Sequence, residues 1–267
     1  MPPPECVMTP DAVEALANPD TVVVVTRQSD ATIRIVTDGW PAGVDPGTQP
    51  VMTTAGVVAV MLDDESSFAT SDFSDARSLL FQREDATSLL AAVGFGQWRA
   101  RTRFCSRCGQ PLQPDAGGKV LRCANDHMHF PHIEPAVIMR VTDDADRVLL
   151  ARQPSWMRGR FSVLAGFVDP GEPLEDAVRR EVMEEVGLTV GQVSYVKSQA
   201  WPFPSSLMVA FAATADTTDI RLMDDEIAEA GWYTREELTT AMDIGEVALP
   251  PPLSVAHQLL RTWMKGD

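Results

Sequence analysis

The pattern of apolar runs and the polar segments between them divides the chain into three parts. In the first part, residues 1–98, the runs at 22–27 and 31–37 predict a pair of strands, and residues 51–62 predict a third. Residues 85–98 predict a helix with Asp85 as its N-cap. This part is expected to be a mixed α/β domain that serves docking or dimerisation as readily as catalysis.

The second part, residues 99–133, is rich in Cys, His, Gly and Pro and poor in aliphatic residues. Such a segment cannot build much of a core, so it needs a cross-link such as a structural metal or a disulfide to hold it together. From residue 134 to 267 strand and helix signals alternate. The expected elements are a hairpin (136–142 with 147–152), a loop at 153–161, strands at 161–168, 193–201, 206–215 and 227–234, an acidic helix after 168, and a last helix near 254–265. Strands mixed with two helices predict a mixed sheet between helices, an α/β fold.

Charge and hydropathy then narrow the class of protein. The 267 residues carry a net charge of -16, which argues against nonspecific binding to nucleic acid or to an anionic membrane. An anionic substrate is still compatible with this charge, because a bound cation inverts the local field. The sequence has no run of 18 apolar residues and no basic segment followed by an apolar one at its start. A cytoplasmic location without a membrane span is therefore expected.

Three of the four cysteines form a metal-site pattern. Cys105 and Cys108 make a C-x2-C knuckle, and Cys123 follows after a gap that suits a zinc ribbon. The fourth ligand would fall at Asp126 in a second knuckle; His127 is the better ligand, and His129 is a weaker candidate. Three Cys plus His form a closed structural zinc site. The alternative is a decayed knuckle that binds no metal. The fourth cysteine, Cys6, is expected to be an ordinary thiol.

A turn and helix over 166–188 carry the candidate catalytic chemistry. The apolar stripe of this helix is Leu174, Val178, Val182 and Val186. Glu181, Glu184 and Glu185 share a face beside that stripe, near the helix C-terminus, where mutual repulsion and the macrodipole both disfavour negative charge. A divalent cation with a preference for oxygen removes both penalties, whereas a solvated helix face is the alternative. Arg180 is placed to orient these carboxylates, and Glu172 to accept from Arg180 or from the helix start.

The full pattern of this segment is G-x5-E-x7-R-E-U-x-E-E-x-G-U, where U is a bulky aliphatic residue. Its positions here are Gly166, Glu172, Arg180, Glu181, Val182, Glu184, Glu185, Gly187 and Leu188. This pattern resembles the signature of the Nudix hydrolases, which cleave nucleoside diphosphates linked to another moiety. The resemblance implies an α/β/α sandwich over 134–267, preceded by a zinc ribbon at 99–133. It assigns metal binding to Glu181, Glu185 and the backbone carbonyl of Ala165.

A second motif narrows the expected substrate. The stretch SQAWPFPSS, residues 198–206, resembles the SQPWPFPxS motif of the NADH pyrophosphatase branch, with Ala200 in place of proline and Ser205 where glutamine is frequent. The branch also has a zinc ribbon, normally with four cysteines. The resemblance implies hydrolysis of NAD(H) to NMN(H) and AMP with Mg²⁺ or Mn²⁺, extends to removal of NAD caps from RNA, and implies a homodimer with composite sites.

A further acidic ligand or base is expected after the acidic helix. Glu226 is favoured over Asp224, Asp225 and Glu229, because it aligns best with the Gly-Trp strand that follows. The expected substrate-binding residues are Phe130, Phe167, Gln199, Ala200, Trp201, Pro202, Phe203, Pro204, Ser205, Ser206 and Ala248. Trp201 and Phe167 offer faces for stacking on a base, and core packing is the alternative for both.

Two other functions fit the same sequence. One is a hydrolase that prefers ADP-ribose or another nucleoside diphosphate derivative. The other is a noncatalytic nucleotide sensor or scaffold, against which the complete set of carboxylates argues.

Overall fold

A computed structural model describes residues 22–27, 33–36, 51–54, 57–62, 86–114, 118–223 and 225–266. The chain divides into two compact units. One contains Glu134–Ala200 and Ser206–Asp267, and the other contains Met1–Ile133 together with Trp201–Ser205.

The unit that starts at Glu134 is built on a six-stranded mixed sheet with the order β11-β12-β8-β9-β13, in which β10 also pairs with β8. Its strands are β8 (Glu134–Thr142), β9 (Val148–Arg152), β10 (Leu164–Phe167), β11 (Val190–Trp201), β12 (Ser206–Ala215) and β13 (Glu229–Tyr233). β12 runs parallel to β8, whereas β10 runs antiparallel to it. This pairing sets the end of β10 beside the start of β8.

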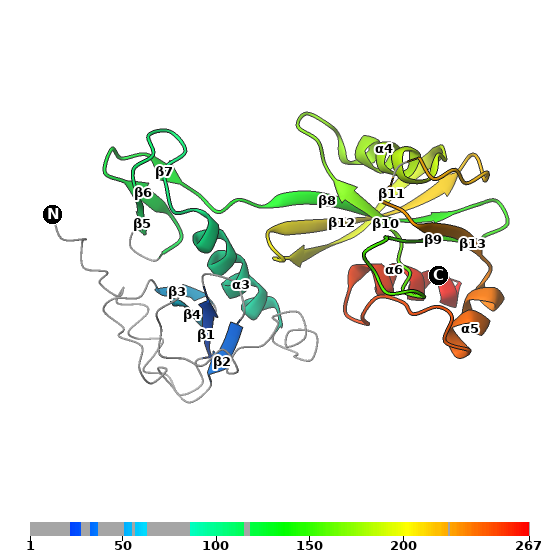
Figure 1. Ribbon diagram of the computed structural model, residues 1–267, viewed down its shortest axis with the longest axis horizontal. Helices are drawn as coiled ribbons and strands as arrows, with labels where there is room; N and C mark the ends of the chain where they lie inside the picture. The colour runs from blue at the N-terminus through cyan, green and yellow to red at the C-terminus, as the bar shows by residue number, and fades with distance from the viewer. Residues whose placement is uncertain are drawn as a thin grey trace. The chain divides into compact units, whose positions relative to one another are not determined.

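Both faces of this sheet are buried, because successive residues of β8 enter different cores. Val137 and Met139 pack with α4 (Leu174–Val186), whereas Ile138, between them, packs with α6 (Val255–Lys265). The helices lie on opposite faces of the sheet (Figure 1). The period of two along a strand thus produces the three layers. The expected α/β/α sandwich is confirmed.

The helices of this unit begin and end at local signals. Pro173 is the N-cap of α4, and Gly187 ends it in the left-handed conformation with a φ of 67°. A third helix, α5 (Arg235–Asp243), corrects the expectation of two. Its start is marked by a capping box in which Thr234 and Glu237 satisfy each other's backbone N–H groups. The short polar sequence hid this helix, since Leu238 is its one fully buried residue.

The described part of the other unit contains a four-stranded sheet, a helix and a small ribbon. The sheet has the order β2-β1-β4-β3 and is formed by β1 (Val22–Arg27), β2 (Ile33–Val36), β3 (Val51–Thr54) and β4 (Val57–Leu62). The single strand expected over 51–62 is therefore wrong: the run folds back as the antiparallel pair β3 and β4. The ribbon contains β5 (Leu112–Pro114), β6 (Leu121–Cys123) and β7 (Met128–His129).

The helix of this unit, α3 (Ala86–Arg101), runs three residues past the expected end at residue 98. Arg99 and Arg101 in its last turn are favoured by the helix dipole, which explains the extension. Asp85 and Cys6 lie outside the described residues.

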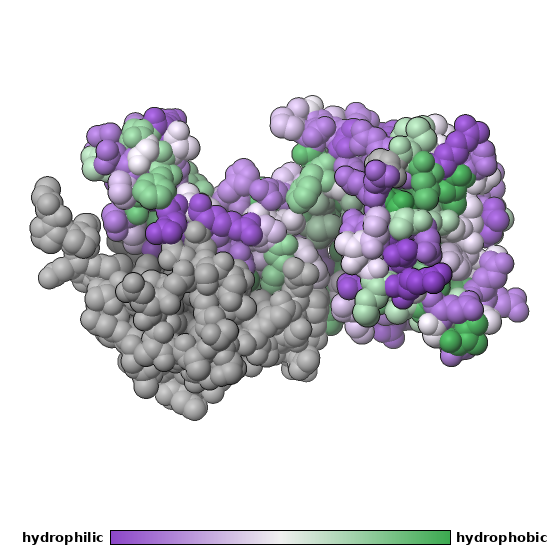
Figure 2. Space-filling view, in the orientation of Figure 1, coloured by the Kyte–Doolittle hydropathy of each residue, from purple (hydrophilic) through white to green (hydrophobic). Residues whose placement is uncertain are grey.

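On the face drawn in Figure 2, the unit that starts at Glu134 carries hydrophilic side chains with groups of apolar ones between them. Within the described ranges, no helix has the length and apolar character needed to cross a membrane.

The double core makes a stability prediction. Leu260 of α6 is 0% exposed, so Leu260→Ala should lower the free energy of unfolding by about 2–5 kcal/mol through lost burial and a cavity. Met157, which is 80% exposed, provides the control, and Met157→Ala should change that free energy by about 0.5 kcal/mol or less. Urea denaturation followed by circular dichroism checks both. Equal effects of the two substitutions would contradict the assigned core.

Candidate functional site

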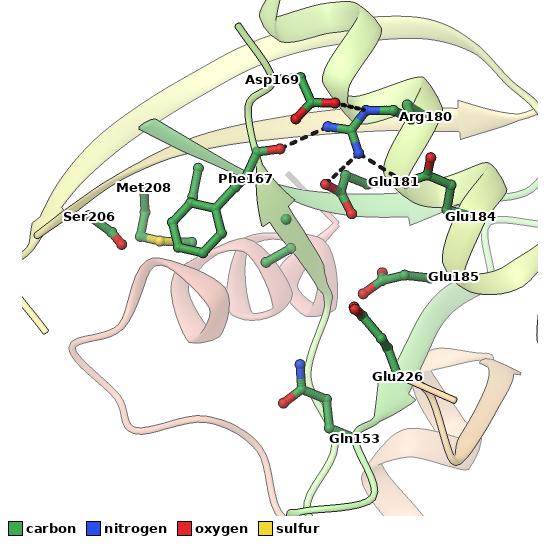
Figure 3. Close-up of a pocket in the computed structure, with 13 residues that line it drawn as sticks. Gln153, Phe167, Asp169, Arg180, Glu181, Glu184, Glu185, Ser206, Met208 and Glu226 are labelled. Carbon is green, nitrogen blue, oxygen red and sulfur yellow. Dashed lines mark hydrogen bonds and ion pairs between the residues drawn. The ribbon is translucent and has the colours of Figure 1, made fainter. Parts of the chain in front are cut away.

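A pocket of about 540 Å³ opens beside α4 and the end of β10. Its lining includes five carboxylates and a single guanidinium, namely Asp169, Glu181, Glu184, Glu185, Glu226 and Arg180. In Figure 3 the side chains of Glu185 and Glu226 approach each other across the cavity from different elements. The concentration of negative charge indicates a site for cations.

Arg180 holds the acidic side chains in place. Its Nε and Nη2 donate to the two oxygens of Glu172 at 2.9 and 2.9 Å. Nη1 donates to Glu181 at 2.8 Å and to Glu184 at 3.0 Å, and Nη2 also donates to the carbonyl of Phe167 at 2.8 Å. The planar guanidinium therefore joins the turn before α4, the helix itself and the end of β10 (Figure 3).

The carboxylates bound to Arg180 differ in their electrostatic surroundings. The hydrogen bonds from Arg180 hold the pKa of Glu172 below its usual range. Burial raises the pKa of Glu181, and Arg180 opposes that rise. Glu181 and Glu185 are buried, whereas Glu184 is exposed. A charged Glu181 in this position is disfavoured by its own desolvation, and a cation in the pocket would offset that cost.

Gly166 makes room for this arrangement. A Cβ on Gly166 would lie 1.9 Å from the carboxyl carbon of Glu181, so any side chain here would displace the carboxylate. The preceding residue, Ala165, pairs with Ile138 in the sheet and also lines the pocket. A rigid strand thus carries the Ala165 backbone to the same cavity as the acidic helix.

Glu226 approaches from the segment before β13. Among its alternatives, Glu229 is committed to an ion pair with Arg152 at 2.8 Å, Asp225 does not line the pocket, and Asp224 lies outside the described residues. Arg152 also accepts from the Ala228 amide at 2.8 Å through its own carbonyl. These two contacts fasten the Glu226 segment to the end of β9.

The oxygen donors present suit a hard divalent cation. The carboxylates of Glu181, Glu185 and Glu226 and the carbonyl-bearing Ala165 all line one cavity, and carboxylate and carbonyl oxygens are the donors that Mg²⁺ and Mn²⁺ prefer. The fit rests on this donor set and on the space that Gly166 leaves for Glu181.

The expected substrate-binding residues do not all line this pocket. Phe167, which is 57% exposed, and Ser206 do. Trp201–Ser205 belong to the other compact unit, where the rings of Trp201 and Phe203 pack edge to face at 5.3 Å. Phe130 is also in that unit and is 61% exposed. Ala248 lies beside Gly159–Phe161 through backbone hydrogen bonds, and Ala200 is exposed at the end of β11.

Gln199 is engaged by the chain itself. Its Nε2 donates to the Leu253 carbonyl at 2.8 Å, and its Oε1 accepts from the Val255 amide at 2.8 Å. The side-chain amide therefore fastens β11 to the segment where α6 begins. In this structure Gln199 positions protein backbone rather than presenting a free amide to a ligand.

Gln153 and Met208 also line the pocket, and sequence reasoning did not find them. Met208 follows Ser206 by two residues on β12, so the strand period offered a signal for it. Gln153 comes directly after β9, and no pattern distinguished it. Asp169 lies in the turn before α4 and also lines the pocket, 3.8 Å from Arg180.

The ribbon brings the four expected zinc ligands together. The ligand atoms of Cys105, Cys108, Cys123 and His127 all lie within 4.8 Å of one another. Cys108 and Cys123 are 3.7 Å apart, and Cys105 lies 3.4 Å from His127 Nδ1. Tetrahedral zinc with bonds of about 2.3 Å to sulfur and about 2.0–2.1 Å to nitrogen has ligand edges close to these lengths. The donor set fits Zn²⁺.

Asp126 explains why His127 faces the cysteines. Asp126 adopts a φ of 60°, and its side chain pairs with Arg122 at 3.3 Å instead of turning inward.

A hydrogen bond from the backbone N–H of Gln110 is the main cause that lowers the pKa of Cys108 to about 6. The lowered pKa favours the thiolate, which is the form that binds metal.

Models of protein families match two segments of the chain. A model of the Nudix domain matches residues 132–250, and a model described as the NADH pyrophosphatase zinc ribbon domain matches residues 100–130. Residues 132–250 therefore form a Nudix domain. A curated relative from Mycobacterium tuberculosis strain H37Rv, named NAD-capped RNA hydrolase NudC, is 42% identical over 201 residues, which are 71% of this chain and 64% of that protein.

A human relative, named NAD-capped RNA hydrolase NUDT12, is 40% identical over 200 residues, covering 70% of this chain and 43% of that protein. The match thus spans less than two thirds of the length of either relative. A solved Nudix hydrolase from Nitrosomonas europaea has a TM-score of 0.48 and 21% identity, covering 62% of this chain and 92% of that one.

The Arg180–Glu172 pair predicts a pH-dependent stability. Because folding lowers the pKa of Glu172, its stabilisation is present above the unfolded value of about 4.3 and is lost as pH falls through the folded pKa. Glu172→Gln should therefore lower the melting temperature at pH 7, and the difference from the unmodified protein should shrink as the pH falls below about 4.3 and vanish below the folded pKa. A thermal melt series from pH 3 to 8 checks this. A difference that persisted unchanged to pH 3 would contradict it.

Proposed function

We propose that this chain hydrolyses the pyrophosphate of NAD(H), with NAD(H) plus water giving NMN(H) plus AMP, in the presence of Mg²⁺ or Mn²⁺. The observation that carries the proposal is the oxygen-lined pocket in which Arg180 holds Glu181 and Glu184 beside Glu185 and Glu226. The roles assigned to these residues, and to Ala165, are part of the proposal.

The chemical difficulty is that pyrophosphate and the pocket are both anionic. Among the described residues that line the pocket, Arg180 is the one cation, and it is already paired with carboxylates. These lining residues therefore offer no free positive charge to a phosphate. Divalent ions held by Glu181, Glu185, Glu226 and the Ala165 carbonyl would neutralise the substrate and lower the pKa of an attacking water.

The protein residues have distinct parts in this proposal. Arg180 keeps the carboxylates of Glu181 and Glu184 at fixed positions, so little reorganisation is needed when the substrate enters. Glu184 is exposed, and Glu226 lies on the segment before β13. Both are placed to orient water or to accept its proton. Phe167, exposed at the pocket, offers a ring face to a base or to nicotinamide.

The proposed substrate follows from the ribbon, the SQAWPFPSS motif and the names of the relatives. Those relatives are named for hydrolysis of NAD-capped RNA, so we extend the proposal to NAD caps at RNA 5′ ends. Trp201, Phe203 and their neighbours, with Phe130 and Ala248, are proposed to contact the dinucleotide. We also propose a cytoplasmic homodimer in which the two copies complete each site.

Removing one buried carboxylate tests the reaction. Glu185→Gln should lower kcat by orders of magnitude, because the isosteric amide cannot supply the charge, while thermal stability and dinucleotide affinity stay near those of the unmodified protein. Steady-state kinetics with Mg²⁺ or Mn²⁺ and calorimetric binding of the dinucleotide measure this. Glu175→Gln, an exposed change in the first turn of the same helix, is the matched control. Unchanged turnover in Glu185→Gln would overturn the metal-site assignment.

A substrate panel tests the assignment to NAD(H). Turnover should be highest on NADH, NAD⁺ or NAD-capped RNA, and lower on ADP-ribose, which lacks the nicotinamide ring that Phe167 and Trp201 are proposed to stack on. Product analysis by mass spectrometry should show NMN(H) and AMP. A preference for ADP-ribose of about a hundredfold, roughly 2.7 kcal/mol in transition-state binding, would replace the proposed substrate and leave the metal site standing.

A further inference from the structure

A second histidine touches the zinc cluster from outside it. His129 Nε2 lies 3.3 Å from the sulfur of Cys105, the same sulfur that His127 Nδ1 approaches at 3.4 Å. His129 is the last residue of β7, and its backbone pairs with Leu121 of β6, directly beside the segment that carries Cys123. The contact is therefore built into the ribbon and does not depend on an unsupported loop.

The geometry separates the roles of the two histidines. His127 belongs to the group of four whose ligand atoms all lie within 4.8 Å of one another, which a single tetrahedral ion requires. His129 does not belong to that group and contacts Cys105 alone among the cluster's sulfur atoms. It is thus placed against a ligand and outside the tetrahedron.

The chemistry of the contact fixes its direction. A cysteine that binds zinc does so as a thiolate, which has no proton to donate. The hydrogen between the two atoms must then belong to the imidazole, so the neutral His129 tautomer is the one protonated at Nε2. We propose that His129 donates an N–H···S hydrogen bond to the zinc-bound thiolate of Cys105 and thereby retains zinc in the ribbon as a positioning residue.

Burial makes this donor important. Cys105 is only 3% exposed, so water contributes little to stabilising its thiolate charge. Three thiolates and one neutral imidazole leave a net charge of -1 on the zinc complex. A donor at Cys105 withdraws part of that charge from the sulfur and makes the thiolate a weaker target for protons and electrophiles. The residue after His129 is Phe130, so the same bond also anchors the backbone that presents this exposed ring.

Three variants of the full chain test the assignment. His129→Phe keeps a ring but removes the donor, and His129→Gln restores an N–H near the same position. Met128→Gln is the matched control. Met128 precedes His129 on β7 and is 45% exposed, and as the adjacent residue of a strand its side chain points to the opposite face from that of His129. Zinc affinity is measured by competition with a chromogenic chelator, and the charge-transfer spectrum is measured with Co²⁺ in place of Zn²⁺.

We expect His129→Phe to bind one equivalent of Zn²⁺ with affinity lowered by about 10–100-fold. Its sulfur-to-cobalt charge-transfer band should move to lower energy, because a thiolate without the hydrogen bond is a stronger electron donor, while the d–d bands of a tetrahedral site persist. His129→Gln should recover most of the affinity, and Met128→Gln should match the unmodified protein. These readouts do not require hydrolytic activity, so their failure is distinguishable from failure of the proposed function.

Two results would overturn the proposal. The first is a His129→Phe protein whose zinc affinity and charge-transfer band equal those of the unmodified protein. The second is a His129→Phe protein that loses the d–d bands of a tetrahedral Co²⁺ site, because His129 would then be a ligand. If His129→Phe does not fold, the unmodified protein loaded with ¹¹³Cd decides by NMR. A protonated Nε2 coupled to cadmium through the sulfur supports the hydrogen bond, and an unprotonated Nε2 or a direct cadmium–nitrogen coupling excludes it.

Discussion

The guanidinium of Arg180 is the interaction on which the acidic site depends. It spans the turn before α4, two glutamates of α4 and the carbonyl that ends β10. Without a positive charge at this point, several carboxylates on one buried helix face would repel one another and titrate upward. Burial alone already moves the pKa of Glu181 in that direction. A single rigid cation therefore lets the protein keep a concentrated negative field in a fixed geometry.

The packing of the sheet between helices fixes the positions of the acidic side chains. The alternation of Val137, Ile138 and Met139 between two cores holds β8 rigidly, and β8 in turn fixes β10 and the Ala165 backbone. Gly166 then supplies the space that a carboxylate needs against a strand. The precision of the site thus comes from sheet register and helix packing, and less from the loops around it.

Much of this arrangement followed from local sequence signals, and what did not depended on distant contacts. The stripe Leu174, Val178, Val182 and Val186 predicted the buried side of α4; its three valines are fully buried, and Leu174 is partly buried. The Nudix pattern identified the pocket acids because their spacing is local to one helix. The missed helix α5 has one buried residue, and Gln153 joins the pocket only through folding. The sequence offered His129 only as a weaker candidate ligand, because its contact with the Cys105 sulfur arises when β7 pairs with β6.

Gln199 carries a consequence for how this protein can change over time. The residue is the second of the motif SQAWPFPSS, yet its amide holds Leu253 and Val255 where α6 begins. The apolar side of α6 fills one of the two cores. A substitution at this position must therefore first preserve the packing of α6, whatever its effect on ligand choice. Drift in specificity is easier at neighbouring positions whose side chains hold no backbone, such as the exposed Ala200, which stands where the motif that this stretch resembles has proline.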